Sequence, residues 1–514
     1  MATPSAHLLN SSFANSPSSA SAISSNTSQR RMPSKLVRHV LTVSLFLVVL
    51  GAALPSWATT YTVTSTADSG TGSLRAALGM AATGDTINFS LTYPATITLT
   101  SGSLLVGTDV TISGPGPAKL FISGGGNSTV FSLNGVTAAI SGVTVENASS
   151  GGFGGGIDNY GSTLTVSNST LSGNSTILGI GVGGGGIDNP LGAKLMVINS
   201  TFSGNSAPDG YGGAILNDGT LTVINSTFSG NSAVSAGAGG AIYNTGSATV
   251  SFSTFSGNSG SYGGGILNAA GTLTLKSTLL AGQTSGVNCD LAGGTATSDG
   301  YNLSDDSSCT FLTATGDQND VTKAATYLGP LANNGSSTTQ TIALLTGSTA
   351  INAIPVTPVN ECTDAFGNPV TTDQRGVLRP QGTGCDIGAY ELILSPQVSA
   401  SPSSVNFDDV ELCRTKTALL ALHDNDATLV QIGPISWIDV TGNQSDFSFR
   451  TYSTTGILGP GKGRSYQIQV KFSPSEEIPE SATLNIVTNA PGSPVQVQIT
   501  GTGIKGPKGC DLNP

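Results

Sequence analysis

A glycine-rich segment that recurs through the middle of the chain limits the possible folds more than any other feature. It occurs five times, ending at Asn159, Asn189, Asn217, Asn244 and Asn268, at steps of 30, 28, 27 and 24 residues. A second segment, STLSGNS or STFSGNS, falls once in each interval and places Asn174, Asn205, Asn231 and Asn258 at steps of 31, 26 and 27 residues. Repeats of this length, with short β-rich segments and no 3.6-residue periodicity, predict a parallel β-helix.

Each coil should contribute one residue to each inward column. The first expected column is Ile157, Ile187, Ile215, Ile242 and Ile266, and the second is Leu171, Phe202, Phe228 and Phe255. Asparagines at equivalent corners are expected to stack into amide ladders. The glycines before each isoleucine are expected to allow positive φ and close approach of the coils. The repeated residues are therefore interpreted first as structural.

The two motifs also resemble those of a known family. GGAI stands at Gly212–Ile215 and Gly239–Ile242, and FxxN at Phe202–Asn205, Phe228–Asn231 and Phe255–Asn258. They resemble the repeats of polymorphic outer-membrane proteins, a family of β-helical surface adhesins. The resemblance covers roughly residues 150–282 and implies a surface location and adhesion.

The N-terminal region carries an export signal. Residues 40–54 form an apolar run of 15, preceded by Lys35 and Arg38 and followed by a small-x-small site ending at Ala58. This pattern predicts a signal peptide within 1–58, cleaved after Ala58, and a start at Met32 would give it ordinary length. A membrane anchor needs roughly 18–20 apolar residues, so that alternative is disfavoured. We expect a secreted or envelope bacterial protein with no transmembrane segment in the mature chain.

Six cysteines follow the signal, and an even number in an exported chain predicts disulfides. Sequence order favours the pairs Cys289–Cys309, Cys362–Cys385 and Cys413–Cys510 among 15 possible pairings. No CxxC motif is present, so a metal site at these thiols is not expected. No cofactor is predicted.

The solenoid needs protection at both ends, because raw strand edges aggregate. Ser73 is a plausible N-cap for a helix over 74–82, with the coils beginning at Asp85–Phe89. GSLRAAL (72–78) resembles the CSLREA-type motif at the start of bacterial β-helix proteins. Arg75 is interpreted as a capping residue rather than a catalytic base.

Residues 283–392 lose the repeat and are predicted to cap the C-terminal end of the 59–282 β-helix. The stretches 328–353 and 372–391 resemble the choice-of-anchor Q domain, a name that denotes association with surface anchors and no reaction. The charged residues here are expected to form a semi-buried ion network: Asp373, Arg375, Arg379, Asp386 and Glu391.

Residues 393–403 read as a linker, and 404–514 hold about seven alternating β segments, which predicts an immunoglobulin-like sandwich. The stretches PSSVNF, LGPGKGRSYQIQVKFSP and LNIVTNAPGSPVQVQITGTG resemble choice-of-anchor D (abnormal-spindle-like) domains. Trp437 is expected in the core.

Charge and histidine content exclude several functions. The net charge is −11, and the chain after Ala58 carries 15 basic against 30 acidic residues. Nucleic acid is therefore not an expected partner, because it requires clustered Lys and Arg. His423 is the only histidine after the predicted cleavage site, which excludes metal sites built on two histidines.

One carboxylate pair suggests chemistry on the solenoid. Asp158 and Asp188 each follow an inward isoleucine and should face outward on adjacent coils, about 5 Å apart. That spacing suits a retaining glycosidase or a shared cation, although a solvated outer face is the simpler interpretation. We predict no catalytic residue and keep this pair as the alternative.

Aromatic residues near the same strands suggest a sugar-binding platform. Phe153, Tyr211 and Tyr262 each lie four residues before an inward isoleucine, and Tyr243 directly follows one. They are the predicted ligand-binding residues, although covering a corner of the coil is the simpler role.

The sequence therefore predicts an all-β protein. It comprises a right-handed, pectin-lyase-like parallel β-helix with an N-terminal capping helix, followed by an immunoglobulin-like sandwich. The predicted function is a non-catalytic secreted or cell-surface protein that mediates adhesion or contacts an extracellular glycan or surface partner. The alternatives are a polysaccharide-degrading glycosidase or lyase, and an inert structural component of the envelope.

Overall fold

The computed structural model describes residues 58–151, 154–176, 183–234, 238–335, 339–393, 398–424, 430–452, 456–458, 465–490 and 493–506. The predicted leader and signal peptide lie outside these ranges except for Ala58. Within them the chain is nearly all β: about nine coils of a parallel β-helix precede antiparallel sheets. The predicted all-β class and the β-helix are confirmed.

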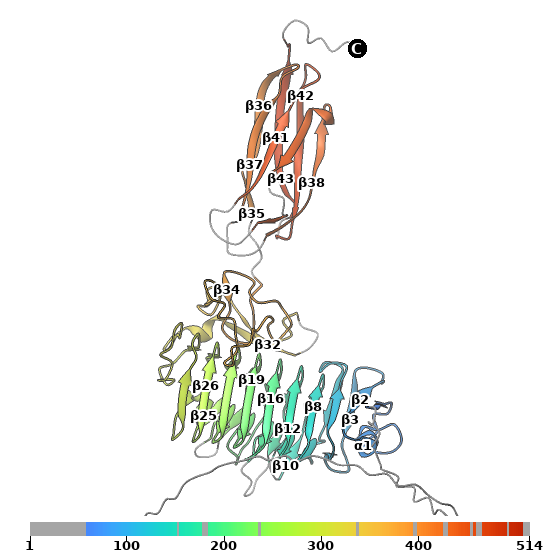
Figure 1. Ribbon diagram of the computed structural model, residues 1–514, viewed down its shortest axis with the longest axis vertical. Coiled ribbons are helices and arrows are strands. Elements are labelled where there is room, and N and C mark those ends of the chain that lie inside the picture. The colour runs from blue at the N-terminus through green and yellow to red at the C-terminus, as the bar shows by residue number, and fades with distance from the viewer. Residues whose placement is uncertain are drawn as a thin grey trace, which may run out of the picture. The chain divides into compact units, whose positions relative to one another are not determined.

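The β-helix has three parallel sheets, and we name them sheets A, B and C. Each coil gives one short strand to each sheet, so chain neighbours lie in different sheets and register partners lie one coil apart. Figure 1 shows strands of sheet A running side by side. Sheet A contains β1 (Thr60–Val63), β2 (Asp85–Phe89), β5 (Val110–Ser113), β8 (Thr137–Ser141), β12 (Thr163–Ser167), β16 (Lys194–Ile198), β19 (Thr220–Ile224), β23 (Ser247–Ser251), β26 (Thr272–Lys276) and β29 (Thr295–Ser298).

Sheets B and C close the coil. Sheet B contains β3 (Ala95–Thr98), β6 (Leu120–Ser123), β9 (Thr144–Glu146), β13 (Thr170–Ser172), β17 (Thr201–Ser203), β20 (Thr227–Ser229), β24 (Thr254–Ser256), β27 (Leu279–Leu280) and β30 (Leu303–Ser304). Sheet C contains β4 (Leu104–Val106), β7 (Phe131–Asn134), β11 (Ile157–Tyr160), β15 (Ile187–Asn189), β18 (Ile215–Asn217), β21 (Ser232–Ala233), β22 (Ile242–Asn244), β25 (Ser259–Asn268) and β28 (Ser285–Asp290). A separate pair joins β10 (Ser149–Ser150) and β14 (Ser175–Thr176). The coils thus continue to Ser304, beyond the predicted boundary at 282.

Both predicted apolar columns are confirmed. The five isoleucines of the repeat are in register in sheet C and fully buried. In sheet B, Leu171 precedes Phe202, Phe228 and Phe255, whose rings stack at 4.9 and 4.6 Å between centroids. Stacking one ring on the next fills the interior at the spacing of the strands, so the column fixes the register of the coils.

Replacing Phe228 with alanine is expected to lower the free energy of unfolding of the β-helix by about 3–5 kcal/mol, because it leaves a cavity between two rings. Phe366→Ala is the matched control, since Phe366 is 62 % exposed and Phe228 is fully buried. Chemical denaturation followed by circular dichroism measures both. Equal effects of the two substitutions would contradict the stacked column.

Asparagine ladders run parallel to the apolar columns. Asn174 donates to Asn205, Asn205 to Asn231 and Asn231 to Asn258, each through Nδ2 to Oδ1 at 2.9 Å. Gln283 accepts from Asn258 at 3.1 Å and continues the ladder into the next coil. A second ladder joins Asn159, Asn189, Asn217, Asn244 and Asn268. These buried amides satisfy one another and nearby carbonyl groups, as the sequence predicts.

The glycines of the repeat serve close approach rather than unusual backbone angles. A Cβ added to Gly155 would lie 2.1 Å from the carbonyl oxygen of Gly185, and one on Gly213 would lie 2.0 Å from that of Gly240. Positive φ occurs instead at the SGNS glycines, among them Gly173, with φ of 59°. The expected positive φ before each isoleucine is therefore wrong, because the left-handed turn falls after the sheet B strand.

Helix α1 (Leu74–Met80) covers the first coils, near β2 in Figure 1. Ser73 caps it by accepting from the amide of Ala76 at 3.1 Å, as predicted, and the helix is two residues shorter than the expected 74–82. Arg75 pairs with Asp68 at 2.6 Å and donates to the carbonyls of Gly102 and Ser103. Arg75 thus links helix α1 to the first coils, which is consistent with its interpretation as a capping residue.

The predicted C-terminal cap is divided between two places. Residues 305–321 follow the last coil, where Cys309 and Leu312 join the core at its end. The rest, which we name the flanking segment (324–335 and 339–392), lies along the outer side of the coils. It contains η1 (Ala324–Tyr327), β31 (Leu328–Ala332), β32 (Thr341–Leu344), β33 (Ile354–Pro355) and β34 (Gly384–Cys385). The expectation that all of 283–392 closes the end is corrected here.

Hydroxyl and amide groups of the coils hold the flanking segment in place. Asn225 donates to the carbonyl of Thr372 at 2.7 Å, and the amide of Ala389 donates to Thr254 at 2.9 Å. These bonds span about 140 residues of sequence, so no local pattern indicated them.

Two predicted disulfides are present. Cys289 and Cys309 tie β28 to the end of the solenoid, and Cys362 and Cys385 close a loop of the flanking segment. Cys413 is exposed, and its predicted partner Cys510 lies outside the described residues.

The C-terminal region forms two sheets. A four-stranded sheet contains β35 (Val398–Ser401), β37 (Lys416–Asp424), β41 (Ser465–Phe472) and β39 (Phe447–Thr451). A five-stranded sheet contains β36 (Ser404–Glu411), β43 (Val495–Ile504), β42 (Pro479–Thr488), β38 (Val430–Thr441) and β40 (Ile457–Leu458), with η2 (Gln444–Asp446) preceding β39. Strand β35 begins within the predicted linker, which is therefore shorter than expected. Trp437 is partly buried and packs on Phe447 and Phe449 at the edge of this core.

Candidate functional site

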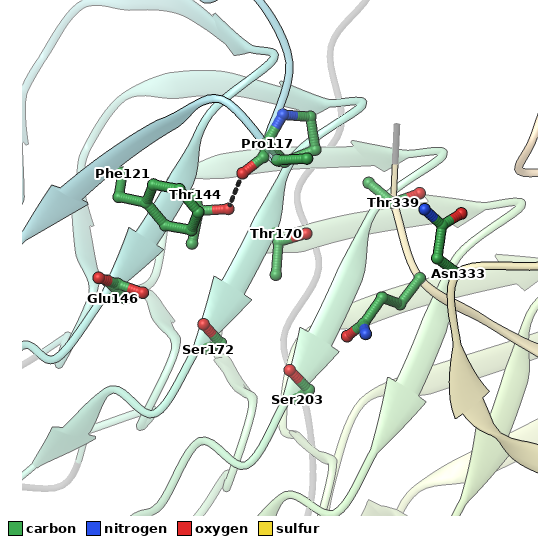
Figure 2. Close-up of a pocket in the computed structure, with 11 residues that line it drawn as sticks. Pro117, Phe121, Thr144, Glu146, Thr170, Ser172, Ser203, Asn333 and Thr339 are labelled. Atoms are coloured by element: carbon green, nitrogen blue, oxygen red, sulfur yellow. Dashed lines mark hydrogen bonds between the residues drawn. The ribbon is translucent and has the colours of Figure 1, made fainter. Parts of the chain in front are cut away.

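A groove on the outer side of sheet B lies between the coils and the flanking segment. Its volume is about 310 Å³. Its walls are the outward side chains of sheet B and the edge of the flanking segment, as Figure 2 shows. The lining residues are Pro117, Ala118, Phe121, Thr144, Glu146, Thr170, Ser172, Ser203, Asn333, Thr339 and Gln340. A volume of roughly 300 Å³ is at the lower end of the range for small-molecule sites.

The wall of the groove follows from the alternation of the strands. In STLSGNS and STFSGNS the apolar residue points inward, so the threonine before it and the serine after it point outward. Thr144 and Thr170 are register partners in one outward column, and Glu146, Ser172 and Ser203 are partners in the next. The repeat therefore builds parallel rows of hydroxyl groups along the groove.

Several of these polar groups have unused hydrogen-bonding capacity. Thr144 donates to the carbonyl of Pro117 at 2.7 Å. Within the described residues, the side-chain oxygens of Thr170, Ser172 and Ser203 have no hydrogen-bond partner. Burial raises the pKa of Glu146, the only ionisable residue among the lining residues. The groove thus offers donors and acceptors to a neutral polar ligand.

The predicted carboxylate pair lies elsewhere, in sheet C. Asp158 and Asp188 are register partners on adjacent strands, as expected. Their environment differs from the expected solvated face: Asp188 is 2 % exposed and Asp158 is half-buried. One side-chain oxygen of each is buried without a hydrogen-bond partner. The backbone approaches closely here, since a Cβ added to Gly184 would lie 2.6 Å from the amide nitrogen of Leu216 on the next coil.

Burial raises the pKa of Asp188 to about 8, and the charges of Asp158 and Asp218 add to the effect. Burial also raises the pKa of Asp158. Asp188 is therefore protonated at neutral pH and is not a nucleophile there. Among the described residues, no group of three or more His, Cys, Asp or Glu is arranged to hold a metal ion.

The predicted aromatic platform is only partly assembled. Tyr211 and Tyr243 stack at 4.7 Å between ring centroids. Tyr262 is 51 % exposed, and Phe153 lies outside the described residues. Tyr243 is two strands from Asp188 in the same outward column of sheet C. Tyr243, Tyr262 and the two carboxylates thus belong to sheet C, whereas the groove lies on sheet B.

The predicted ion network is present within the flanking segment. Arg375 pairs with Asp373 at 2.6 Å, and Arg379 pairs with Glu391 at 2.9 Å. Asp386 accepts from the amides of Asn352 and Leu392. The hydrogen bonds of these charged groups are made within the segment, and Nε of Arg379 is the one buried polar atom among them that has no partner in the described residues. The network therefore holds the flanking segment together.

Sequence reasoning missed the groove. The alternation of the repeat was sufficient to identify Thr170, Ser172 and Ser203 as outward hydroxyl groups. The opposite wall was not predictable, because Asn333 and Thr339 are at least 130 residues away in the sequence and belong to a segment expected at the end of the solenoid.

The coils, ladders and groove define a parallel β-helix protein. The repeat of Chlamydia polymorphic membrane proteins, as a family model, matches residues 199–218 and 225–245. These stretches contain the FxxN and GGAI motifs in strands β17, β18, β20 and β22. This part of the chain is therefore a β-helix similar to that of polymorphic membrane proteins.

No curated protein sequence matches the chain. Among solved structures, the ASH/PapD-like domain of human CEP192 (PapD-like domain 7) is similar at 18 % identity, with a TM-score of 0.19, over 22 % of this chain and 89 % of that chain. No helix in the described ranges has the length and apolarity needed to span a bilayer.

Proposed function

We propose that the protein is exported by a bacterium and acts at or outside the cell surface as a non-catalytic β-helix that contacts glycans. The observation that carries the proposal is the groove on sheet B, whose hydroxyl groups and single carboxylate suit the hydroxyl groups of a sugar. The match of two coils to a surface-protein repeat and the predicted signal peptide support the location.

The remaining modules fit the same role. We propose that the flanking segment corresponds to a choice-of-anchor Q-like domain, and that the C-terminal sheets form an immunoglobulin-like, choice-of-anchor D-like module. Tyr211, Tyr243 and Tyr262 are a second candidate contact surface, because Tyr262 is exposed and the rings of Tyr211 and Tyr243 stack on each other.

The hydrolase alternative has less support. A retaining glycosidase needs an ionised nucleophile that reaches the sugar. Asp188 is 2 % exposed and is protonated at neutral pH, and Asp158 is half-buried beside it. The support is lower because so little of either carboxyl is open to a sugar.

A glycan-array screen of the full chain, with reducing-end and unsaturated-product assays on each hit, tests the proposal. We expect binding without product, and Glu146→Gln is expected to weaken binding by about tenfold or more, because it removes a charged hydrogen-bond acceptor. Asp209→Asn, at an exposed carboxylate outside the groove, is the matched control.

Product release from any bound glycan would refute the non-catalytic proposal, and absence of binding to every glycan would refute glycan contact. Loss of binding in Tyr262→Ala but not in Glu146→Gln would move the contact to the tyrosines of sheet C.

A further inference from the structure

Two carboxyl groups of the C-terminal sheets are buried without a basic partner. Asp446 is 4 % exposed and Glu480 is 3 % exposed. Neither forms an ion pair with a basic side chain within the described residues. The buried carboxylates of the flanking segment differ, because Asp373 and Glu391 each pair with an arginine. An unpaired buried charge is costly, so the pair in the C-terminal sheets needs either a proton or a cation.

The ends of two strands bring these carboxyl groups together. Strand β38 ends at Thr441, and its register partner Ser481 directly follows Glu480 in β42. Gly442 comes next with a φ of 90°, and a Cβ added to it would lie 2.5 Å from Oε2 of Glu480. A side chain at this position would displace the carboxyl, so the glycine keeps a place for it. The chain then turns through η2 and ends that turn at Asp446.

Hydrogen bonds hold each carboxyl group mainly by one of its two oxygens. The amide of Asn443 donates to Oε2 of Glu480 at 2.9 Å. The amide and the hydroxyl of Ser475 donate to Oδ2 of Asp446 at 2.6 and 2.8 Å. Oε1 of Glu480 is buried and has no hydrogen-bond partner within the described residues. The hydroxyl of Ser445, at 3.5 Å, is the one group that contacts Oδ1 of Asp446 in the same part of the chain.

The carboxyl groups of Asp446 and Glu480 are in direct contact. Burial raises the pKa of Glu480 to about 7, and the neighbouring Asp446 and Glu476 add to the effect. Glu476 and residues 443–445 are exposed, so the two carboxyl groups lie just beneath the surface. A single proton neutralises one of the two charges, whereas a divalent cation neutralises both.

We propose that Asp446 and Glu480 bind a calcium ion between the end of β38 and the start of β42. Oδ1 of Asp446 and Oε1 of Glu480 are the protein ligands, and water completes the coordination by about six to eight oxygens that calcium takes. Carboxylate ligands without histidine or cysteine favour calcium over zinc or copper. Because the protein supplies only two charged ligands, the affinity is expected in the range of extracellular modules, about 10⁻⁴–10⁻³ M.

Terbium luminescence excited through tryptophan tests the site in the full chain, since terbium(III) is a hard cation that prefers oxygen ligands, as calcium does. Trp437 is the only tryptophan after the predicted cleavage site, and it packs on Phe447, which directly follows Asp446. Terbium bound at the site is therefore expected to luminesce when Trp437 is excited, and calcium is expected to displace it.

Substitutions separate the site from general attraction to an acidic surface. Glu480→Gln and Asp446→Asn are each expected to weaken terbium binding by about tenfold or more, because each removes a charged ligand. Glu477→Gln is the matched control, since Glu477 is an exposed carboxylate in the loop that precedes β42. It is expected to change binding by less than about twofold, because water and salt screen an exposed charge.

Hydrogen exchange gives a readout that needs no substitution. Calcium at about ten times its dissociation constant is expected to slow exchange at residues 441–447 and 473–481 by about tenfold, because the ion binds only the folded loops. Exchange in β12 of the solenoid should not change.

Absence of luminescence, failure of calcium to displace terbium, or unchanged exchange at these loops would overturn the calcium site. A proton shared between the two carboxyl groups would then explain their burial. Equal losses of binding in Glu477→Gln and Glu480→Gln would also overturn the site, because surface charge rather than the buried pair would hold the cation.

Discussion

Replacement of Arg379 with methionine is expected to destabilise the flanking segment by about 3–5 kcal/mol, because it leaves a buried carboxylate without its partner. The Arg379 side chain is 0 % exposed and pairs with Glu391 at 2.9 Å. It also donates to the carbonyls of Asp386 at 2.9 Å and Gly388 at 2.7 Å. Its guanidinium lies 4.7 Å from the ring centroid of Phe252 on the solenoid. One side chain thus closes a turn of the segment and packs it against the coils.

Arg414 provides a matched control, because it pairs with Glu411 at 2.8 Å while its side chain is 68 % exposed. Arg414→Met is expected to change stability by at most about 1 kcal/mol, as exposed ion pairs do. Hydrogen exchange of residues 370–392 and thermal unfolding measure both variants. If the two substitutions have equal effects, the buried pair does not hold the segment.

Asp188 is expected to make the β-helix less stable as the pH rises. An aspartate in the unfolded chain titrates near pH 4, whereas burial and the neighbouring carboxylates raise the pKa of Asp188 to about 8 in the fold. Between these values the unfolded chain releases a proton that the folded chain keeps. The free energy of unfolding therefore falls with increasing pH, by up to about 1.4 kcal/mol per unit from this group. The contribution of Asp188 to the free energy of unfolding is fully present below about pH 4. It declines as the pH rises and is lost at about pH 8.

Asp188→Asn removes this dependence, because an amide does not ionise. We expect the variant to unfold at a temperature several degrees above that of the natural protein at pH 8 and to differ little from it at pH 4. Asp209→Asn is the control, since Asp209 is an exposed carboxylate on the same solenoid. Melting curves from pH 4 to 9 that fall equally for the natural protein and Asp188→Asn would contradict the buried position of this carboxyl.

The features that repeat were the ones predictable from the sequence. The position of each isoleucine, phenylalanine and asparagine follows from the period, because equivalent residues of successive coils must be register partners. The same reasoning predicted that Asp158 and Asp188 would be neighbours. It did not predict their burial, which depends on how the glycine-rich turns approach the outer side of the strand.

Features that occur once were harder to predict. The flanking segment was expected at the end of the solenoid, because nothing local indicates that Gln374 reaches Thr201 and Thr227 more than 140 residues earlier. The groove depends on that long-range contact, since the segment forms one of its walls. The outward rows of threonine and serine could be predicted from the sequence, but the groove beside them could not.

The hydrogen bonds from the flanking segment also bear on how such a chain can change its length during evolution. Bonds between the two parts start at Asn199 and extend to Ser277, with Gln374 spanning two adjacent coils. A duplicated or deleted repeat within this stretch would shift every later coil by one strand spacing and break the match to the segment. A change among the coils before Asn199 disturbs only its immediate neighbours. Related proteins are therefore expected to differ in the number of coils before Asn199 and to keep the number between Asn199 and Ser277 constant.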